Sequence, residues 1–168
     1  MKKTDKTFIG IDPGLSGAVA VIDPKGSVLF FDTPTTLVSS KSSRRSYAPS
    51  NMVNLLSVIG HETGSVFLHV GIERQQAMPK QGVSSTFSTG YGFGLWIGIL
   101  ASLSLPYTIV DPRAWKKKTM AGMGKEKGAS IIRATQLYPA SVKWLERKKD
   151  HNRADALLIA DYIKHLRG

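Results

Sequence analysis

Apolar residues alternate with small ones along the first predicted strand, which ends on a carboxylate. In residues 8–22, FIGIDPGLSGAVAVI, this strand ends at Asp12 and the chain turns through Pro13 and two glycines into a second apolar strand. Side chains alternate along a strand, so Gly10 and Asp12 share one face and the carboxylate leaves the sheet at the C-terminal end. Asp-Pro-Gly is also good turn chemistry, so Asp12 alone is equally consistent with a turn cap.

Two more strands are predicted to complete an antiparallel meander. They cover residues 18–23 and 28–32 and are separated by a Pro-Lys-Gly turn. Residues 33–49 are rich in Ser and Thr and match neither the helix nor the strand period. We therefore expect a mobile loop there, whose three cations either contact phosphate or stay solvated.

The pattern then repeats around a second carboxylate. A helix is predicted over residues 49–62 from its apolar stripe, followed by a strand over 66–73, VFLHVGIE. Again a glycine stands two residues before a terminal acid, Glu73. A strand-helix-strand connection favours parallel strands, so Asp12 and Glu73 are expected side by side at the edge of the sheet where sites collect.

The remaining pattern predicts one strand and four helices. A nearly uniformly apolar, Gly-rich helix near residues 84–104 is expected to be buried against the sheet or against a second copy of the chain. A fifth strand covers 107–111, and Asp111 is interpreted as the N-cap of a following helix with Pro112 at its first position. Two further helices are predicted over residues 125–138 and 150–166.

Composition narrows the class of protein. With 168 residues, 42% of them hydrophobic, the chain is expected to form one domain over 1–168. Its 23 Lys and Arg against 12 Asp and Glu give a net charge of +11, which favours a polyanionic partner such as nucleic acid, although ribosomal and membrane-surface proteins share this bias. The absence of cysteine excludes disulfides and thiolate metal sites, so a metal must be held by carboxylate or imidazole, which favours Mg²⁺ or Mn²⁺.

No apolar leader precedes the first strand, and the most apolar segment is too short and too rich in glycine for a bilayer span. We therefore expect an intracellular protein with no membrane partner. The expected location is the cytoplasm or nucleoid, the host cell if the protein is phage-encoded, or an organelle.

Two segments are candidates for contact with nucleic acid. Residues 74–90 carry cations and one aromatic, Phe87, which either stacks on an unpaired base or packs beneath the following helix. Residues 113–127, RAWKKKTMAGMGKEK, are the densest basic patch and include Trp115; they either contact phosphate or form a solvated face. The candidate contact residues are Arg74, Lys80, Phe87, Lys116, Lys117, Lys118 and Lys125.

The last predicted helix contains DHNRADALLIADYIKHL, in which His151 and Asp155 lie one turn apart on one face. Such a pair suits metal binding or proton transfer. A structural role is the alternative, with Asp150 capping the helix and Asp155 pairing with Arg153 or a neighbouring Lys.

Together with the two strand-end carboxylates, this pair suits phosphodiester hydrolysis by two divalent metal ions. Asp12 is expected to bridge both ions because the first strand is central and rigid. The flanking groups, Glu73, His151 and Asp155, would each hold one ion. Four such groups close together are destabilising without cations, so we expect Mg²⁺ to stabilise the protein.

Four motifs, GIDPGLSGA, GIE, AMPKQGVSSTF and DHNRADALLIADY, resemble the RuvC superfamily of Holliday-junction resolvases, especially its phage, bacterial and chloroplast branch. The resemblance covers residues 8–166. It implies an α/β, ribonuclease H-like fold: a five-stranded mixed sheet, three antiparallel strands then two parallel ones, flanked by helices. It also implies a Mg²⁺-dependent crossover junction endodeoxyribonuclease, a homodimer with two metal ions per active site that nicks a four-way DNA junction symmetrically in recombination and repair.

By position, the resemblance implies that Asp12, Glu73 and Asp155 are the catalytic, metal-binding carboxylates and His151 the fourth member. Bacterial members space the last two ligands three residues apart, which would select Asn152 here. We favour His151 because imidazole is the better ligand and base.

The resemblance also relates Phe87 to an aromatic inserted at the junction centre, and Lys116 to Lys118 with Lys125 to basic groups near the scissile phosphate. Three rival functions remain. They are an ATPase of the actin and sugar-kinase type, for which the chain lacks room for a second lobe, a nuclease of the same fold acting on RNA–DNA hybrid or duplex DNA, and a junction-binding module without catalysis.

Overall fold

A five-stranded mixed sheet forms the centre of the computed structural model, which describes residues 6–41, 43–63, 67–124, 126 and 128–167. The strand order is β3-β2-β1-β6-β7, with an antiparallel meander on one side and two parallel additions on the other. This arrangement confirms the predicted fold class. The strands are β1 (Lys6–Asp12), β2 (Ala18–Ile22), β3 (Val28–Asp32), β6 (Phe67–Glu73) and β7 (Tyr107–Val110).

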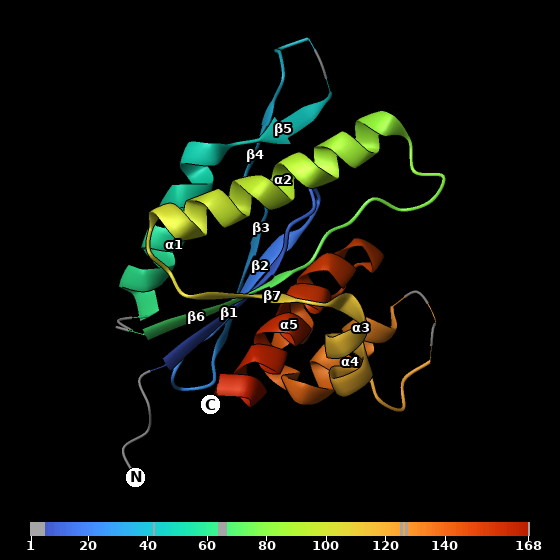
Figure 1. Cartoon of the computed structure of the whole chain (residues 1–168). Helices are drawn as coiled ribbons and strands as arrows, with labels where there is room; N and C mark the ends of the chain where they lie inside the picture. Colours follow the sequence, from blue (N-terminus) through green and yellow to red (C-terminus); the bar gives the residue numbers. More distant parts are fainter. Residues whose placement is uncertain (1–5, 42, 64–66, 125, 127, 168) are drawn as a thin grey trace.

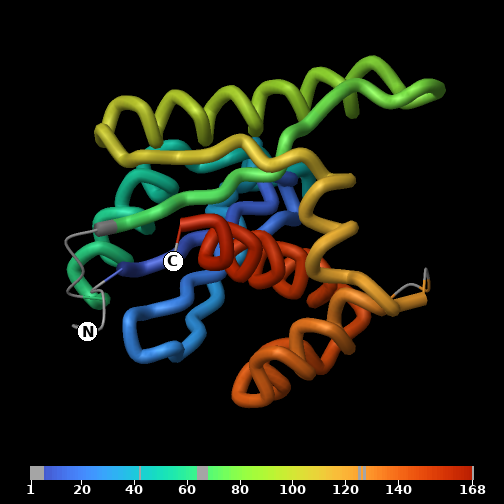
Figure 2. Tube along the Cα trace, turned by 60° about the horizontal axis from the view of Figure 1, so that its bottom comes forward, coloured from blue at the N-terminus to red at the C-terminus, as the bar shows by residue number. Residues whose placement is uncertain are grey.

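Helices cover both faces of the sheet (Figure 1). On one face lie α1 (Pro49–Thr63) and α2 (Val83–Ser102). On the other lie α3, α4 and α5, and the view along the trace in Figure 2 shows α5 running beneath the sheet, on the side away from α2. The helical elements of this second layer are α3 (Pro112–Thr119), α4 (Ala129–Leu137), two 3₁₀ helices, η1 (Pro139–Trp144) and η2 (Lys148–Asp150), and α5 (His151–Arg167).

Side chains alternate between the two faces of β1 and pack into two separate hydrophobic cores. Ile9 and Ile11 pack with Trp96 and its neighbours beneath α1 and α2. Phe8 packs with Leu158 and its neighbours beneath α5. A central strand buried on both faces is rigid, and it fixes the direction in which its terminal carboxylate points.

The expected mobile loop over residues 33–49 is wrong. This segment contains a two-stranded hairpin, β4 (Thr35–Leu37) and β5 (Arg45–Tyr47). Tyr47 anchors it, because its ring is buried and its hydroxyl donates a hydrogen bond of 3.2 Å to the carbonyl of Pro13. This anchor depends on a residue 34 positions away, which the local pattern of Ser and Thr does not reveal.

Other local predictions fare better. Asp111 is the N-cap of α3, since its carboxylate accepts a 2.8 Å hydrogen bond from the backbone N–H of Arg113, and Pro112 opens the helix as expected. The Gly-rich helix is α2, but it buries only one side, and Phe87 lies on its exposed side. The predicted helix over 125–138 is shorter in the described residues, beginning at Ala129, and Lys125 lies outside them.

Candidate active site

Asp12 and Glu73 end neighbouring parallel strands at the same edge of the sheet. The register pairs Ile11 with Ile72, so each carboxylate follows directly after a paired residue. The expectation that these two acids emerge side by side is confirmed. Because side chains two apart in a strand share a face, each acid faces the same layer as the glycine two residues before it.

These two glycines determine how closely α5 approaches the sheet. A Cβ atom on Gly10 would overlap the backbone of Ala156. A Cβ on Gly71 would overlap the side chain of Ile163. Glycine is therefore required at the position where the helix backbone touches the strand. The close packing brings the N-terminal half of α5, with Asp155, to the edge that carries the two strand-end acids.

Asp12 has an unusual electrostatic environment. Burial raises its pKa from 3.8 to about 7, and the negative charge of Glu73 adds to this effect. Asp155 raises the pKa further, while the backbone N–H of Gly14, which donates a 3.2 Å hydrogen bond to the carboxylate, lowers it. The three carboxylates thus interact with one another, and Asp12 resists ionisation first because it is buried and second because negative charge is concentrated around it.

Asp155 is the third member of this cluster. Burial raises its pKa, and Glu73 contributes in the same direction. A hydrogen bond with Ser130 and the positive charge of Lys116 lower it. The alternative that Asp155 pairs with Arg153 is wrong, because that guanidinium forms an ion pair with Asp32 at 2.7 Å.

His151 lies close enough to lower the pKa of both Asp12 and Asp155. Its Nδ1 is 2.9 Å from the carbonyl oxygen of Lys148. A carbonyl oxygen only accepts, so Nδ1 carries the proton in this hydrogen bond and the lone pair of a neutral ring is left on Nε2. Histidines that bind metals are commonly oriented by such a hydrogen bond from the other ring nitrogen.

Asn152, the alternative fourth residue, is used differently. Its side-chain amide donates a 2.5 Å hydrogen bond to the backbone carbonyl of Ser16. This contact ties the start of α5 to the loop that follows Asp12. Neighbouring Asp150 forms an ion pair with Arg147 at 2.7 Å, so the acid at the end of η2 has a structural partner.

Two residues that hold Glu73 were not identified from the sequence. The indole N–H of Trp115 donates a 2.9 Å hydrogen bond to one oxygen, and the side-chain amide of Gln75 donates a 3.1 Å hydrogen bond to the other. Trp115 is fully buried, so it is not a surface aromatic of the basic patch. The signal that could have indicated an inward-facing position is the helical spacing of Trp115 and Thr119, which lie four residues apart on one face of α3.

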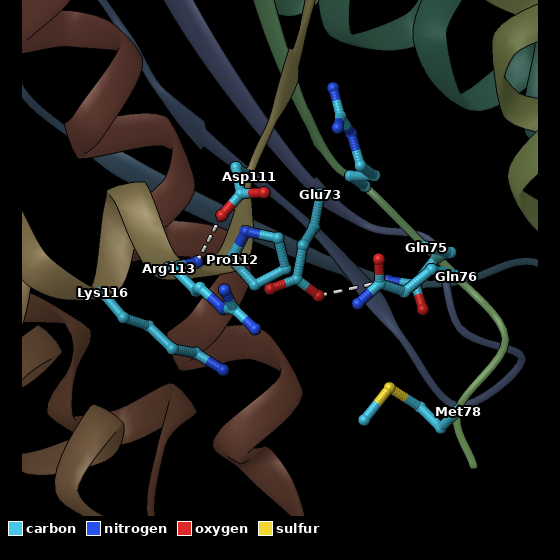
Figure 3. Close-up of a pocket in the computed structure, with 9 residues that line it drawn as sticks. Glu73, Gln75, Gln76, Met78, Asp111, Pro112, Arg113 and Lys116 are labelled. Atoms are coloured by element: carbon cyan, nitrogen blue, oxygen red, sulfur yellow. Dashed lines mark hydrogen bonds between the residues drawn. The ribbon is translucent and has the colours of Figure 1, made fainter.

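A groove of about 440 Å³ adjoins Glu73 (Figure 3). Gln75 enters it from the loop after β6, and Asp111, Arg113 and Lys116 enter it from the other side. The ammonium group of Lys116 also lies 5.1 Å from the centre of the Trp115 ring. The groove therefore offers cations directly beside the acidic cluster. Its lining residues are Glu73, Arg74, Gln75, Gln76, Met78, Asp111, Pro112, Arg113 and Lys116.

The other basic candidates lie on the surface. Lys117 and Lys118 are exposed on α3, and the latter places its ammonium 5.6 Å from the ring centre of Tyr162. Lys80 is exposed in the loop before α2 and has a left-handed backbone, with φ of 65°. Among the candidates on α3, Lys116 is the one that lines the groove beside Glu73.

Phe87 is 75% exposed in the first turns of α2. Its ring stacks on that of Tyr91, with centroids 6.4 Å apart and planes 2° from parallel. The alternative that Phe87 packs beneath this helix is therefore wrong. Tyr91 also contacts the ring of Tyr47, the buried anchor of the β4–β5 hairpin. The three rings therefore form a row that runs from this anchor to the surface.

The described residues contain no group of three or more acidic, histidine or cysteine side chains arranged as a preformed metal-ion site. In the same part of the chain, no helix has the length and apolar character needed to cross a membrane.

The fold and the sequence both have known counterparts. No protein-family model matches the chain. The structure of Thermus thermophilus RuvC in complex with a Holliday junction substrate superposes with a TM-score of 0.56 and 14% identity, covering 96% of each chain. The chain has the RuvC fold. The crystal structure of the yeast mitochondrial Holliday junction resolvase Ydc2 superposes on this chain with a TM-score of 0.52 and 15% identity, covering 98% of this chain and 82% of that one.

In sequence, the chain is 32% identical over 99 residues to the chloroplastic Holliday junction resolvase MOC1 of Chlamydomonas reinhardtii. The match covers 59% of this chain but only 11% of that much longer protein. The resemblance that the four motifs indicate thus has support from this sequence relative, and the solved structures confirm the fold that it implies.

Proposed function

We propose that this RuvC-fold protein is a structure-specific endonuclease that resolves four-way DNA junctions by hydrolysing phosphodiester bonds. The observation that carries the proposal is the convergence of Asp12, Glu73 and Asp155 at one edge of the sheet, where burial, together with the charges of the other two acids, raises the pKa of Asp12 to about 7. The names of the sequence relative and of two structural neighbours support a junction as the substrate.

The acidic cluster fits divalent cations by its chemistry. The three carboxylates are hard donors of the kind that Mg²⁺ and Mn²⁺ accept, and the imidazole of His151 would add a nitrogen donor. Mutual repulsion among the acids is what a bound cation would relieve. We propose that Asp12, Glu73, Asp155 and His151 would together hold the divalent ions. Such ions would activate the attacking water and stabilise the charge on the leaving 3′ oxygen.

The chain's own residues would prepare the substrate for this chemistry. Lys116, beside Glu73 in the groove, is placed to bind the phosphate next to the scissile bond and to balance its charge. His151, held by its hydrogen bond to the Lys148 carbonyl, keeps Nε2 available as ligand or base. Lys117 and Lys118 on α3, Lys80 on the loop after β6 and Lys125 in the same basic segment would contact DNA away from the cleavage point. Arg74, which lines the groove, would contact DNA close to Glu73.

We further propose that two copies act together on one junction, inside the cell or organelle where such junctions form. The exposed side of α2 supports this, because Val83 is 87% and Tyr91 45% exposed on the same helix. Phe87 would stack on a base freed at the junction centre. Light scattering at micromolar concentration should give the mass of a dimer, with and without junction DNA. A monomeric mass in both conditions would refute the dimer without affecting the cleavage site.

The function is tested by comparing three substrates: a mobile four-way junction, a linear duplex of matched sequence and an RNA–DNA hybrid. Each is incubated with wild type or Asp12→Asn, in Mg²⁺ or EDTA. We expect cleavage of the junction alone, dependent on the metal and on Asp12, with junction binding by the variant largely unchanged because affinity resides in the basic surface. Cleavage of hybrid or duplex instead would assign the site to another nuclease class.

A further inference from the structure

We propose that Trp115 and Gln75 are positioning residues that hold Glu73 in its metal-binding orientation. This inference rests on the proposed function, since it assigns Glu73 to the metal site. Trp115 and Gln75 hydrogen-bond to a proposed ligand without binding metal themselves, and neither belongs to the four motifs. In Figure 3 the carboxylate of Glu73 lies between the Gln75 loop and the start of α3, with one dashed hydrogen bond from the Gln75 amide.

The two donors restrain the carboxylate from both oxygens. Trp115 Nε1 donates to Oε1 at 2.9 Å and Gln75 Nε2 donates to Oε2 at 3.1 Å. A carboxylate has about four acceptor positions, so each oxygen keeps one lone pair for a cation. Two hydrogen bonds to different oxygens also fix the rotation of the carboxylate plane. Glu73 has more rotatable bonds than an Asp, and it therefore needs such restraint to present the same oxygens each time.

The stronger of the two donors is rigid. Trp115 is fully buried in the first half of α3, a helix anchored by the Asp111 cap. The Thr119 hydroxyl donates a 2.9 Å hydrogen bond to the Trp115 carbonyl one turn later. The strand before this helix, β7, pairs directly with the strand that carries Glu73. The sheet therefore places donor and acceptor together, and the hydrogen bond crosses 42 positions in sequence.

Trp96 provides a matched comparison within the same chain. It is also fully buried, in the core on the other face of the sheet. Its Nε1 has no hydrogen-bond partner among the described residues, whereas that of Trp115 has a charged one. Replacing either by Phe removes a similar volume from a core. Only the Trp115 change also removes a donor from Glu73.

The first test needs no substitution. Wild type labelled with ¹⁵N should give three indole N–H signals, from Trp96, Trp115 and Trp144, assigned by single Trp→Phe variants. Titration with Mg²⁺ should shift the Trp115 signal, because a cation on Glu73 withdraws charge from the acceptor oxygen. The Trp96 signal should stay in place. A titration in which metal binds, as shown by the backbone signals of Asp12 and Asp155, while the Trp115 indole signal does not move would overturn the proposal.

The second test measures metal affinity directly. Isothermal titration of Mn²⁺ into the free protein should show about 10–100-fold weaker binding for Trp115→Phe, and affinity close to wild type for Trp96→Phe. Gln75→Met, which changes a loop side chain outside the core, should weaken binding in the same direction and keeps the test valid if Trp115→Phe does not fold. Junction affinity measured in EDTA should not change in any of the three.

The outcomes separate this inference from the proposed function. If wild type binds Mn²⁺ and the Trp115 and Gln75 variants bind it equally well, the positioning role is wrong and the metal site stands. If wild type binds no metal, free or with junction DNA, the metal site itself is wrong and the positioning role with it.

Discussion

Gly10 on β1 lies directly against the backbone of Ala156 on α5, with no room for a Cβ atom between them. This contact fixes the depth at which the helix crosses the sheet. It lies two residues before Asp12 on the strand and one residue after Asp155 on the helix. A single close approach of two backbones therefore sets the relative positions of two acids that are distant in sequence.

Replacing Gly10 by Ala should disturb both stability and the site. Since the obstructing atoms belong to the backbone, the helix must move, and we expect a loss of about 3 kcal/mol or more in the free energy of unfolding. Gly60→Ala, in α1 where the nearest atom to a new Cβ is 3.9 Å away, is the control and should be neutral or stabilising by up to about 1 kcal/mol. Urea denaturation measures both. Equal stability of the two variants would contradict the account of the contact.

The raised pKa of Asp12 predicts a pH-dependent stability. The group titrates near 3.8 when unfolded and at about 7 when folded, so the metal-free protein loses stability as pH rises between these values. Asp12→Asn removes this loss. The variant should be more stable than wild type by up to about 4 kcal/mol at pH 8 in EDTA, and the difference should shrink as pH falls towards 4. Thermal unfolding at both pH values is the measurement, and a difference that grows at low pH would have the wrong sign.

Lys116 and Lys117 are adjacent exposed cations with different predicted roles. Only the first lines the groove beside Glu73 and lowers the pKa of Asp155. Lys116→Ala should slow junction cleavage by about 10–100-fold under saturating DNA, because it removes a cation next to the scissile phosphate. Lys117→Ala should change the rate by less than about threefold and act mainly on binding and its salt dependence. Single-turnover rates separate the two effects, and equal rates would show that proximity to Glu73 does not matter.

His151 and Asn152 can be separated in the same way. His151→Ala should reduce the cleavage rate by about 10²–10⁴-fold, with a folded protein that still binds junctions. Asn152→Ala removes the hydrogen bond to the Ser16 carbonyl, so it should cost about 1 kcal/mol of stability and leave the rate within a few-fold of wild type. If the Asn152 variant loses cleavage and the His151 variant keeps it, the assignment of the fourth residue is reversed.

Much of the fold and the acidic site could be predicted from the sequence because local pattern and topology agree there. The repeated spacing of glycine and acid, Gly10 with Asp12 and Gly71 with Glu73, marks two strand ends, and the connection between them favours a parallel pair. The pattern alone does not explain the two glycines, because their role depends on contacts with α5: Gly10 with Ala156, 146 positions away, and Gly71 with Ile163, 92 positions away.

Features that depend on distant partners could not be predicted. The β4–β5 hairpin is anchored through Tyr47 to the Pro13 carbonyl, a contact without a local signature. Trp115 stands among cations in the sequence, yet the periodicity of α3 buries it and directs its N–H to Glu73. Both errors share one cause, since composition describes a segment and not the side of it that meets the rest of the molecule.

Cleavage of a supercoiled plasmid that extrudes a cruciform tests the central claim most directly. The wild type in Mg²⁺ should convert the plasmid mainly to linear product with paired nicks at the cruciform base, and Asp12→Asn, Glu73→Gln and Asp155→Asn should leave it uncut while still binding the junction. Cleavage that persists in these variants, or that falls at positions unrelated to the cruciform, would contradict the assignment of the site.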